Sequence, residues 1–473
     1  MTKSLPSMTP QVPECTQWRQ GELVELLVTD MSKDGDGVGR WQNRVVFVPD
    51  SVCGDRVLVR LVHVKHEYAY GQLCQIMLPS PHRIRPPCFV ADKCGGCQWQ
   101  HIQYPHQLVI KQNQIREALT RIGGLNNPPV EPVLAAPHPL SYRNKVTYPV
   151  TDSSEVPYVR IGYYQKGSHH VINLNQCPIQ DERLNPLLAG VKQDIQQRGW
   201  SIYQESEHRG TIRHLCLRIG RRTGEMLLAL IIHDYELPQI QEQAQQWLNQ
   251  YPNLVGVCLN YNPQRTNRIL GHATHCVAGR SYLKEFLGGC LFHVSIDHFF
   301  QVYTEQAEAL VNLVIDDLTL TGREILLDAY CGIGTLSLPL AKRVRKLIGL
   351  EVQESSIQQA KENARLNGIE NLQFFTGKVE EQLLSCLGQQ GEPCPDIVLL
   401  DPPRKGCDQK VIECLLHHRP NRIVYISCQP TTLARDLKQL CGGGLYRLNR
   451  VQPIDFFPQT HHVESVAFLS RNY

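Results

Sequence analysis

Residues 326–335, with the sequence Leu-Leu-Asp-Ala-Tyr-Cys-Gly-Ile-Gly-Thr, decide the fold that we predict for this chain. An apolar run leads into a turn that contains Gly332 and Gly334, and the residues beyond the turn favour a helix. Because glycine has no Cβ, such a turn lets the backbone approach a bound ligand closely. The next apolar run ends at Glu351, where a carboxylate can hold two ribose hydroxyls. The stretch therefore predicts a nucleotide-type site on an α/β sheet.

The number of glycines distinguishes two kinds of cofactor. Dinucleotide-binding turns carry a third glycine, but Leu336 and Ser337 occupy that part of this turn. S-adenosylmethionine has no pyrophosphate group to cradle, so a shorter glycine turn suits it better than it suits NAD. We therefore expect S-adenosylmethionine at this site, with Glu351 on its ribose.

Further short apolar runs follow the glycine turn and alternate with helical sequence. We expect strands over residues 325–328, 346–350, 372–375, 397–400 and 423–427. A helix over residues 354–367 lies between the second and third of these strands. Strands separated by helices are typical of a doubly wound parallel sheet, so we predict a Rossmann-like domain over residues 296–473.

Cys428 directly follows the last predicted strand and precedes Gln429 and Pro430, which cannot continue it. In an open α/β sheet this position faces the crevice in which ligands bind. The C5 atom of uracil is not nucleophilic enough to accept a methyl group unaided. Addition of the Cys428 sulfur to C6 would produce an enolate whose C5 can attack the methyl group of a sulfonium. The thiol therefore indicates methylation of a pyrimidine at carbon.

The sequence Asp401-Pro402-Pro403-Arg404 follows the preceding predicted strand and narrows the substrate. Its prolines predict a rigid loop that directs Asp401 into the crevice, while Arg404 and Lys405 can contact phosphate. Enzymes that methylate exocyclic amines usually carry an aromatic residue where Arg404 stands. Cytosine-C5 methylases carry a cysteine in this loop, but Cys407 is out of register with that position. Uracil is therefore favoured, and cytosine stays open.

The proposed chemistry also needs a base, because the C5 proton must be removed before the thiolate can leave the ring. Glu464, in the sequence His462-Val463-Glu464 close to the C-terminus, is the candidate. We expect His461 and His462 to be structural or positioning groups.

The composition is that of an ordinary globular protein. The chain has 473 residues, of which 42% are hydrophobic and 20% charged, and this length exceeds what one core organises. No export signal opens it, and its longest apolar run, residues 226–232, is too short to cross a membrane. Eighteen cysteines in such a chain are expected to be reduced, so we predict a cytoplasmic protein.

The first 295 residues divide into three predicted parts. Residues 1–17 have several prolines and no periodicity, which predicts a flexible tail. Residues 18–80 contain short strand-like runs over 22–28, 44–48, 56–64 and 69–76. These runs predict a small OB-like barrel, with residues 34–40 as a turn-rich connector. Residues 81–295 mix strand-like and helical runs, so we expect an α+β domain there.

Four cysteines in the 81–295 part form a candidate metal site. Cys88, Cys94 and Cys97 are close in sequence, and Cys177 lies further along the chain. Four thiolates suit either a zinc ion or an iron–sulfur cluster. A zinc ribbon would repeat the Cys-x2-Cys pair, and radical enzymes use Cys-x3-Cys-x2-Cys. The spacing therefore predicts a metal without choosing it.

These residues jointly resemble the uracil-C5 RNA methyltransferases, the family that makes 5-methyluridine in ribosomal and transfer RNA. The resemblance covers nearly the whole chain. Besides the four cysteines and the glycine turn, it is carried by Tyr142-Arg143-Asn144-Lys145, Phe299-Phe300-Gln301, Asp401-Pro402-Pro403-Arg404, Ser427-Cys428 and His462-Val463-Glu464.

The resemblance implies an organisation that spacing alone does not give. It makes residues 18–80 a TRAM domain, which is an RNA-binding module. It makes residues 81–295 a central RNA-binding domain, whose helix over residues 104–122 is expected to pack on the catalytic domain. It also makes the four cysteines the ligands of a [4Fe–4S] cluster with a structural role.

The same resemblance implies roles for residues of the catalytic domain. Gln301, Tyr330, Glu351 and Asp401 align with the contacts of the family to S-adenosylmethionine and the substrate. Cys428 aligns with the nucleophile and Glu464 with the base.

The resemblance finally bears on the RNA. Members that act on transfer RNA often lack both the barrel and the cysteine cluster, so we expect 23S ribosomal RNA, with transfer RNA as the alternative. The uridine must leave its stack to reach the thiol, which favours a single-stranded loop and base flipping. A non-catalytic RNA-binding or assembly protein is the third hypothesis, and the intact Cys428, Glu464 and Gln301 speak against it. We expect a monomer that binds neither DNA nor membranes.

Overall fold

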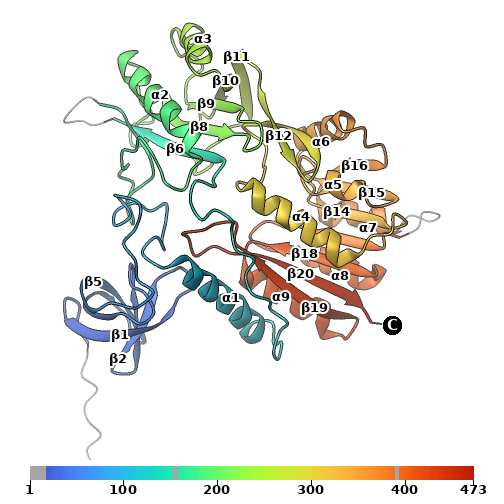
Figure 1. Cartoon of the computed structure of the whole chain (residues 1–473), viewed down its shortest axis with the longest axis horizontal. Helices are drawn as coiled ribbons and strands as arrows, with labels where there is room; N and C mark the ends of the chain where they lie inside the picture. The colour runs from blue at the N-terminus through green and yellow to red at the C-terminus, as the bar shows by residue number, and fades with distance from the viewer. Residues whose placement is uncertain (1–17, 153–157, 389–393, 473) are drawn as a thin grey trace, which may run out of the picture. The chain divides into compact units, whose positions relative to one another are not determined.

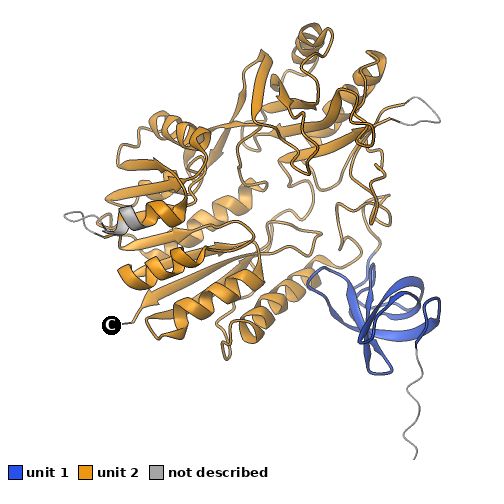
Figure 2. Ribbon diagram, turned by 180° about the vertical axis from the view of Figure 1, so that it is seen from behind, with its two compact units in different colours: residues 1–84 blue, residues 85–473 orange. Residues whose placement is uncertain are grey.

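The computed structural model describes residues 18–152, 158–388 and 394–472. The chain forms two compact units, Met1–Ile84 and Arg85–Tyr473, which are coloured separately in Figure 2. The predicted tail over residues 1–17 lies outside the described residues. Within the described ranges, no helix is both long enough and apolar enough to cross a membrane.

The first unit is a closed five-stranded barrel with strand order β1-β2-β3-β5-β4. Its strands are β1 (Leu23–Met31), β2 (Gly37–Trp41), β3 (Arg44–Val48), β4 (Arg56–Val64) and β5 (Tyr68–Leu78). Alternate residues of each strand point inward, and in β1 these are Val24, Leu26 and Val28. The sequence pattern predicted four of these strands.

The strand β2 corrects the prediction of a turn-rich connector over residues 34–40. Its glycines are required by close packing inside the barrel and not by a turn. A Cβ on Gly37 would lie 2.0 Å from the Ser51 Oγ, and one on Gly39 would lie 2.5 Å from the Leu26 Cδ1. A glycine-rich strand of this kind is read as a loop from sequence, because glycine is depleted in most strands.

The N-terminal part of the second unit carries a six-stranded sheet with order β11-β10-β9-β8-β6-β7 and a two-stranded sheet, β12-β13. The strands are β6 (Lys145–Thr151), β7 (Arg160–Ile161), β8 (Ile212–Ile219), β9 (Met226–Ile232), β10 (Leu254–Tyr261), β11 (Ala273–Gly279), β12 (Tyr282–Leu287) and β13 (Cys290–Ser295). A short 3-10 helix, η1 (Glu182–Leu184), precedes α2 (Asn185–Gln197), and α3 (Ile240–Gln250) follows β9. Apolar residues of α2 and α3 cover one face of the larger sheet. The strands β11, β12 and β13 were not predicted.

The C-terminal part is a seven-stranded sheet with order β16-β15-β14-β17-β18-β20-β19. Its strands are β14 (Ile325–Ala329), β15 (Lys346–Glu351), β16 (Leu372–Thr376), β17 (Ile397–Leu400), β18 (Arg422–Ser427), β19 (Tyr446–Ile454) and β20 (Glu464–Arg471). The first five are parallel, and β20 runs antiparallel to both of its neighbours. The five parallel strands lie where the sequence predicted them.

Helices cover both faces of this sheet, because successive residues of each strand point to opposite sides. Leu326 contributes to the core on one side, with α4 and α5, and Leu327 to the core on the other, with α1, α7, α8 and α9. The helices are α1 (Tyr104–Arg121), α4 (Thr304–Leu318), α5 (Ser337–Ala341), α6 (Glu354–Leu366), α7 (Val379–Gly388), α8 (Gln409–His418) and α9 (Pro430–Gly442).

The helix α1 comes from far upstream in the sequence, yet it packs beside α9 and β19 (Figure 1). Its buried residues Ile115 and Leu119 join the core on that side of the sheet. Pro105 stands in its first turn, where the missing N–H costs no hydrogen bond, and Gly124 follows its end with φ +67°. One continuous core also joins Ala229 of β9 to Leu326 of β14.

Candidate active site and cysteine cluster

The candidate active site lies at the carboxyl ends of the parallel strands. The strand order reverses between β14 and β17, because β15 and β16 lie on one side of β14 and β17 and β18 on the other. Ligands bind at such a switch point in open α/β sheets. Tyr330 follows β14, Asp401 follows β17 and Cys428 follows β18. The topology therefore brings three of the predicted site residues together at the carboxyl ends of the parallel strands.

The pairing of β18 with β20 brings Cys428 and Glu464 to the same place. Ser427 pairs with Ser465 in this antiparallel ladder. Cys428 comes one residue after Ser427, and Glu464 one residue before Ser465, so the register sets them opposite each other. Residues in such positions have Cβ atoms about 4.5–5.5 Å apart. Both side chains are half-buried, which leaves a route for a substrate.

Burial and neighbouring carboxyl groups shape the ionisation of the two residues. Burial raises the pKa of the Cys428 thiol to about 11, and Glu464 and Asp401 add to the rise. Burial also raises the pKa of Glu464 to about 7. Arg404 opposes both shifts, since its positive charge favours a thiolate and a carboxylate. The sequence assigned Arg404 to phosphate contact, and this electrostatic effect on the site was not predicted.

Burial and two neighbouring carboxyl groups favour the protonated form of Asp401. Its pKa is raised well above the usual value, first by burial and then by the charges of Glu464 and Asp328. Three carboxyl groups this close cannot all be ionised at low cost. A neutral carboxyl group both donates and accepts a hydrogen bond, which matches an amide edge such as that of a uracil ring.

The glycine turn after β14 has the shape of a ligand cradle. Gly332 has φ +53°, and a Cβ at this position would meet nothing within 4 Å. Tyr330 has φ +88°, an unusual value for a residue with a side chain and one that clusters at functional sites. The Glu351 Oε2 accepts a hydrogen bond from the Gly332 N–H at 3.2 Å. The carboxylate at the end of β15 is therefore fixed beside the open turn.

Gln301 belongs to a different segment, which leads into α4. It is buried, with 8% of its surface exposed. The Asn144 side chain donates hydrogen bonds to the Gln301 carbonyl at 2.9 Å and to the Thr304 Oγ1 at 3.1 Å. Tyr142, from the same motif, donates its hydroxyl to the Pro458 carbonyl at 3.1 Å. The Tyr142–Lys145 motif thus ties the segment of Gln301 and the loop before Glu464 to one another.

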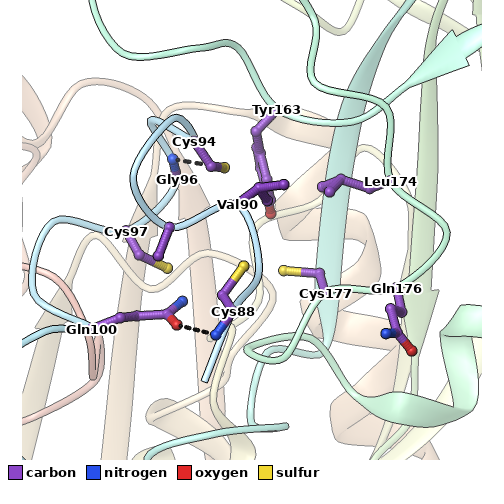
Figure 3. A pocket seen from close by; sticks show the side chains of 11 residues that line it. Cys88, Val90, Cys94, Gly96, Cys97, Gln100, Tyr163, Leu174, Gln176 and Cys177 are labelled. Carbon is purple, nitrogen blue, oxygen red and sulfur yellow. Dashed lines mark hydrogen bonds between the residues drawn. The ribbon is translucent and has the colours of Figure 1, made fainter. Parts of the chain in front are cut away.

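The four cysteines of the candidate metal site line one pocket, although Cys177 lies far from the others in sequence. Figure 3 shows the sulfur atoms of Cys88, Cys97 and Cys177 facing a common space. The Cys94 Sγ accepts a hydrogen bond from the Gly96 N–H at 3.4 Å. Burial raises the pKa of Cys97 to about 12 and that of Cys177 to about 11, and the neighbouring thiols add to both shifts.

These four thiols fit a soft metal centre by their chemistry, because thiolates are the ligands that zinc and iron–sulfur centres share. In the described parts of the chain, however, no three Cys, His, Asp or Glu side chains lie close enough together to hold a single metal ion. The prediction of a metal therefore stays a prediction.

The structure contains one buried ion pair that sequence reasoning missed. The Lys111 Nζ lies 2.7 Å from the Asp455 Oδ1, and both side chains are fully buried. Lys111 sits among the buried residues of α1, between Ile110 and Ile115. A lysine on the apolar face of a helix is a signal for such a pair, because a buried cation requires a partner. Asp455 belongs to the loop between β19 and β20.

The strand order of the sheet, with a site at the carboxyl ends of β14 and β17, is that of a class I S-adenosylmethionine-dependent methyltransferase. The model of the tRNA (uracil-5-)-methyltransferase family matches residues 103–472, and that of the TRAM domain matches residues 17–74. The chain belongs to the tRNA (uracil-5-)-methyltransferase family and is an S-adenosylmethionine-dependent RNA methyltransferase. The predicted family, fold class and enzyme class are thereby confirmed.

Known relatives span almost the entire chain. A protein of Nostoc sp., named as an uncharacterized RNA methyltransferase, is 62% identical over 96% of this chain and 97% of its own length. A Synechocystis protein with the same description is 52% identical over 96% of both chains. The crystal structure of Pyrococcus abyssi tRNA (uracil-54, C5)-methyltransferase, in complex with S-adenosyl-L-homocysteine, is similar with a TM-score of 0.75 and 26% identity. The match covers 94% of this chain and 99% of that one.

Proposed function

We propose that this protein transfers a methyl group to C5 of a uridine in RNA, through a covalent bond between Cys428 and C6. The observation that carries the proposal is the register of β18 and β20. It sets a thiol and a carboxyl group opposite each other at the carboxyl end of β18. The thiol can add to the ring, and the carboxyl group can take a proton from it. The family membership supports uracil as the base that reacts.

The first step requires the Cys428 thiol to lose its proton. The raised pKa of this thiol means that the sulfur is protonated at neutral pH in the free protein. Arg404 favours the thiolate, whereas burial and the carboxyl groups of Glu464 and Asp401 oppose it. The thiol proton passes to solvent water, the sulfur bonds to C6, and the electrons of the C5=C6 bond move toward the O4 atom. We infer that Asp401 contacts the polar edge of the ring.

The glycine turn and Glu351 fit S-adenosylmethionine. The open space at Gly332 leaves room for it, and the Glu351 carboxylate beside the turn suits its ribose hydroxyls. When bound, S-adenosylmethionine would supply the methyl group of its sulfonium to C5 of the enolate, and it would leave as S-adenosyl-L-homocysteine. We infer that Tyr330 and Gln301 complete the contacts to cofactor and substrate.

Glu464 then restores the ring. Its carboxylate accepts the proton from C5, the electrons of the C5–H bond form the C5=C6 double bond, and the C6–S bond breaks. Cys428 leaves as a thiolate, and 5-methyluridine is released. The pKa of about 7 suits this role. A substantial fraction of the group is ionised at neutral pH, and this carboxylate is basic enough to accept a proton.

We further propose 23S ribosomal RNA as the substrate. The proposal rests on the joint presence of the TRAM barrel and the four-cysteine pocket, which many transfer-RNA members of the family lack. Transfer RNA is the second candidate. It is favoured by the Pyrococcus abyssi structure, whose protein acts on uracil 54 of tRNA and matches 94% of this chain.

Mapping of 5-methyluridine in total RNA tests this proposal. In a strain that lacks the gene, we expect one or more 5-methyluridines to disappear from 23S ribosomal RNA, with transfer RNA unchanged. Reintroduced wild-type protein is expected to restore them, and the Cys428→Ala variant is not. Loss of 5-methyluridine from transfer RNA alone would favour the second candidate. An unchanged pattern in both RNAs would contradict uridine methylation.

We also propose that Cys88, Cys94, Cys97 and Cys177 hold a [4Fe–4S] cluster with a structural role, which joins the segment over residues 88–97 to that of Cys177. The proposal is supported by the common pocket and by the family resemblance. A bound metal would stabilise the thiolate forms that burial disfavours.

Protein purified without oxygen is expected to be brown and to contain about four iron atoms per chain. Its visible spectrum should show thiolate-to-iron bands. The Cys177→Ser variant is expected to lose most of the iron, because one of four ligands is removed. The matched Cys276→Ser variant changes a half-buried cysteine outside the pocket and is expected to keep its iron. Stoichiometric zinc in place of iron would contradict the proposal.

A further inference from the structure

The loop over residues 455–463 joins β19 to β20 and ends directly before Glu464. Although it is not part of the sheet, it is largely buried: Asp455 is fully buried, and Gln459 and Thr460 have 6% and 7% of their surface exposed. Gln459 has φ +70°, a left-handed conformation that a non-glycine residue keeps only when its surroundings hold it. Contacts from distant parts of the chain hold the loop in this conformation.

The segment that carries the cysteines supplies the first contacts. The backbone N–H groups of Gln98 and Trp99 both donate to the Gln459 carbonyl, at 3.1 and 3.0 Å. Gln98 directly follows Cys97, which lines the cysteine pocket. Near the other end of the same segment, the Cys88 N–H donates to the Gln100 Oε1 at 3.2 Å. The loop before Glu464 is therefore tied to the cysteine pocket through one short stretch of backbone.

Gln107 of α1 joins the same two segments through its side chain. Its Oε1 accepts from the Gln459 N–H at 3.0 Å, and its Nε2 contacts the Gln459 Oε1 at 3.0 Å. The Nε2 also donates to the carbonyls of Trp99, at 3.0 Å, and Ile102, at 2.9 Å. Gln107 is fully buried, so water cannot replace these bonds.

Two further side chains, those of Lys111 and Tyr142, fix the rest of the loop. The Lys111 Nζ contacts the Asp455 Oδ1 at 2.7 Å and the Phe457 carbonyl at 3.0 Å. The Tyr142 hydroxyl donates to the Pro458 carbonyl at 3.1 Å. Each partner comes from more than 300 residues upstream in the sequence.

We propose that Gln107 is a positioning residue for Glu464, because it holds the loop 455–463 against α1 and the cysteine-bearing segment. The inference rests on the proposed function, in which Glu464 removes the C5 proton. Cys428 follows the central strand β18, which pairs on both sides, so its position depends on the sheet. Glu464 is the first residue of β20, at the end of its pairing with β19, so its position depends on the loop before it as well as on the sheet. Loosening the loop should therefore slow the removal of the C5 proton by Glu464 and leave the addition of Cys428 to C6 unchanged.

The Gln107→Met variant separates these two steps, because methionine keeps the volume and loses the hydrogen bonds. The Gln459→Met variant removes the side-chain pair with Gln107 from the loop side, together with the bond from the Gln459 Nε2 to the Pro139 carbonyl. It covers the case in which the first variant folds poorly. The matched control is Gln112→Met, on the same helix, whose Nε2 contacts the Val130 carbonyl at 3.4 Å and not the loop.

Two readouts are compared in each variant. The rate of covalent bond formation with 5-fluorouridine RNA reports the steps up to methyl transfer, because the base cannot remove fluorine from C5. We expect this rate to stay within about twofold of the wild type in both variants. Turnover on uridine RNA is expected to fall by about tenfold to 100-fold, since a displacement of about 1 Å in a catalytic group costs rate on this scale. Methylated covalent complex should accumulate, and Gln112→Met should change neither readout.

Other outcomes bear on different claims. Equal slowing of both readouts in Gln107→Met and Gln459→Met would assign the pair a general structural role and overturn the inference. Unchanged turnover in the two variants would overturn it as well. If the wild-type protein itself formed no covalent bond with 5-fluorouridine RNA, the proposed function would fail.

Discussion

The Cys428→Ala variant is expected to lose methyl transfer by at least about 10⁴-fold while it still binds RNA and S-adenosylmethionine. Without the sulfur, the mechanism has no group to add to C6, so C5 does not become electron-rich. With 5-fluorouridine RNA and S-adenosylmethionine, the wild-type protein should give a complex that survives denaturing electrophoresis. The variant should give none.

The control for this experiment is Cys394→Ala, which changes an exposed cysteine in the same unit. It is expected to keep both turnover and the covalent complex. RNA affinity of Cys428→Ala, measured by filter binding, should stay within about threefold of the wild type, because the thiol is small beside the whole RNA contact. Full turnover in Cys428→Ala would make the thiol incidental and end the covalent mechanism.

The parallel sheet could be predicted because each of its strands is a short apolar run bounded by turns. The run Ile423–Ser427 is an example, and β18 covers residues 422–427. The edge strand β19 was not recognised, since Arg447, Asn449 and Arg450 interrupt its apolar pattern. The barrel strand β2 was missed for a different reason. Its glycines are required by close contacts with residues that are distant in sequence, and these contacts exist only in the folded barrel.

The chemical types of the site residues could also be predicted, but their arrangement could not. A cysteine after a strand and a carboxylate in a short motif are visible in the sequence. That Cys428 and Glu464 stand opposite each other depends on the register of β18 with β20, which no local pattern encodes. The contact of Gln107 with Gln459 joins residues 352 positions apart. Such contacts follow from the packing of α1 on the catalytic sheet.

The Glu464→Gln variant is expected to stall after methyl transfer. Glutamine keeps the size of the side chain but cannot accept the C5 proton, so the C6–S bond persists. Turnover on uridine RNA should fall by about 10²-fold to 10⁴-fold, the usual range for loss of a general base. Denaturing gels with methyl-labelled S-adenosylmethionine should show labelled RNA bound to the protein. The Glu413→Gln variant, in an exposed position on α8, should turn over normally.

The pH dependence of the release step provides a second test of Glu464. Its pKa is raised to about 7, so the group is mostly protonated below pH 6 and mostly ionised above pH 8. Only the ionised form can take the C5 proton, and breakdown of the covalent intermediate should therefore accelerate as the pH rises through about 7. Rapid-quench measurements at several pH values give this rate separately from the earlier thiol step. A release rate that stays constant across this range, or a Glu464→Gln variant that releases its product normally, would assign the proton transfer to another group.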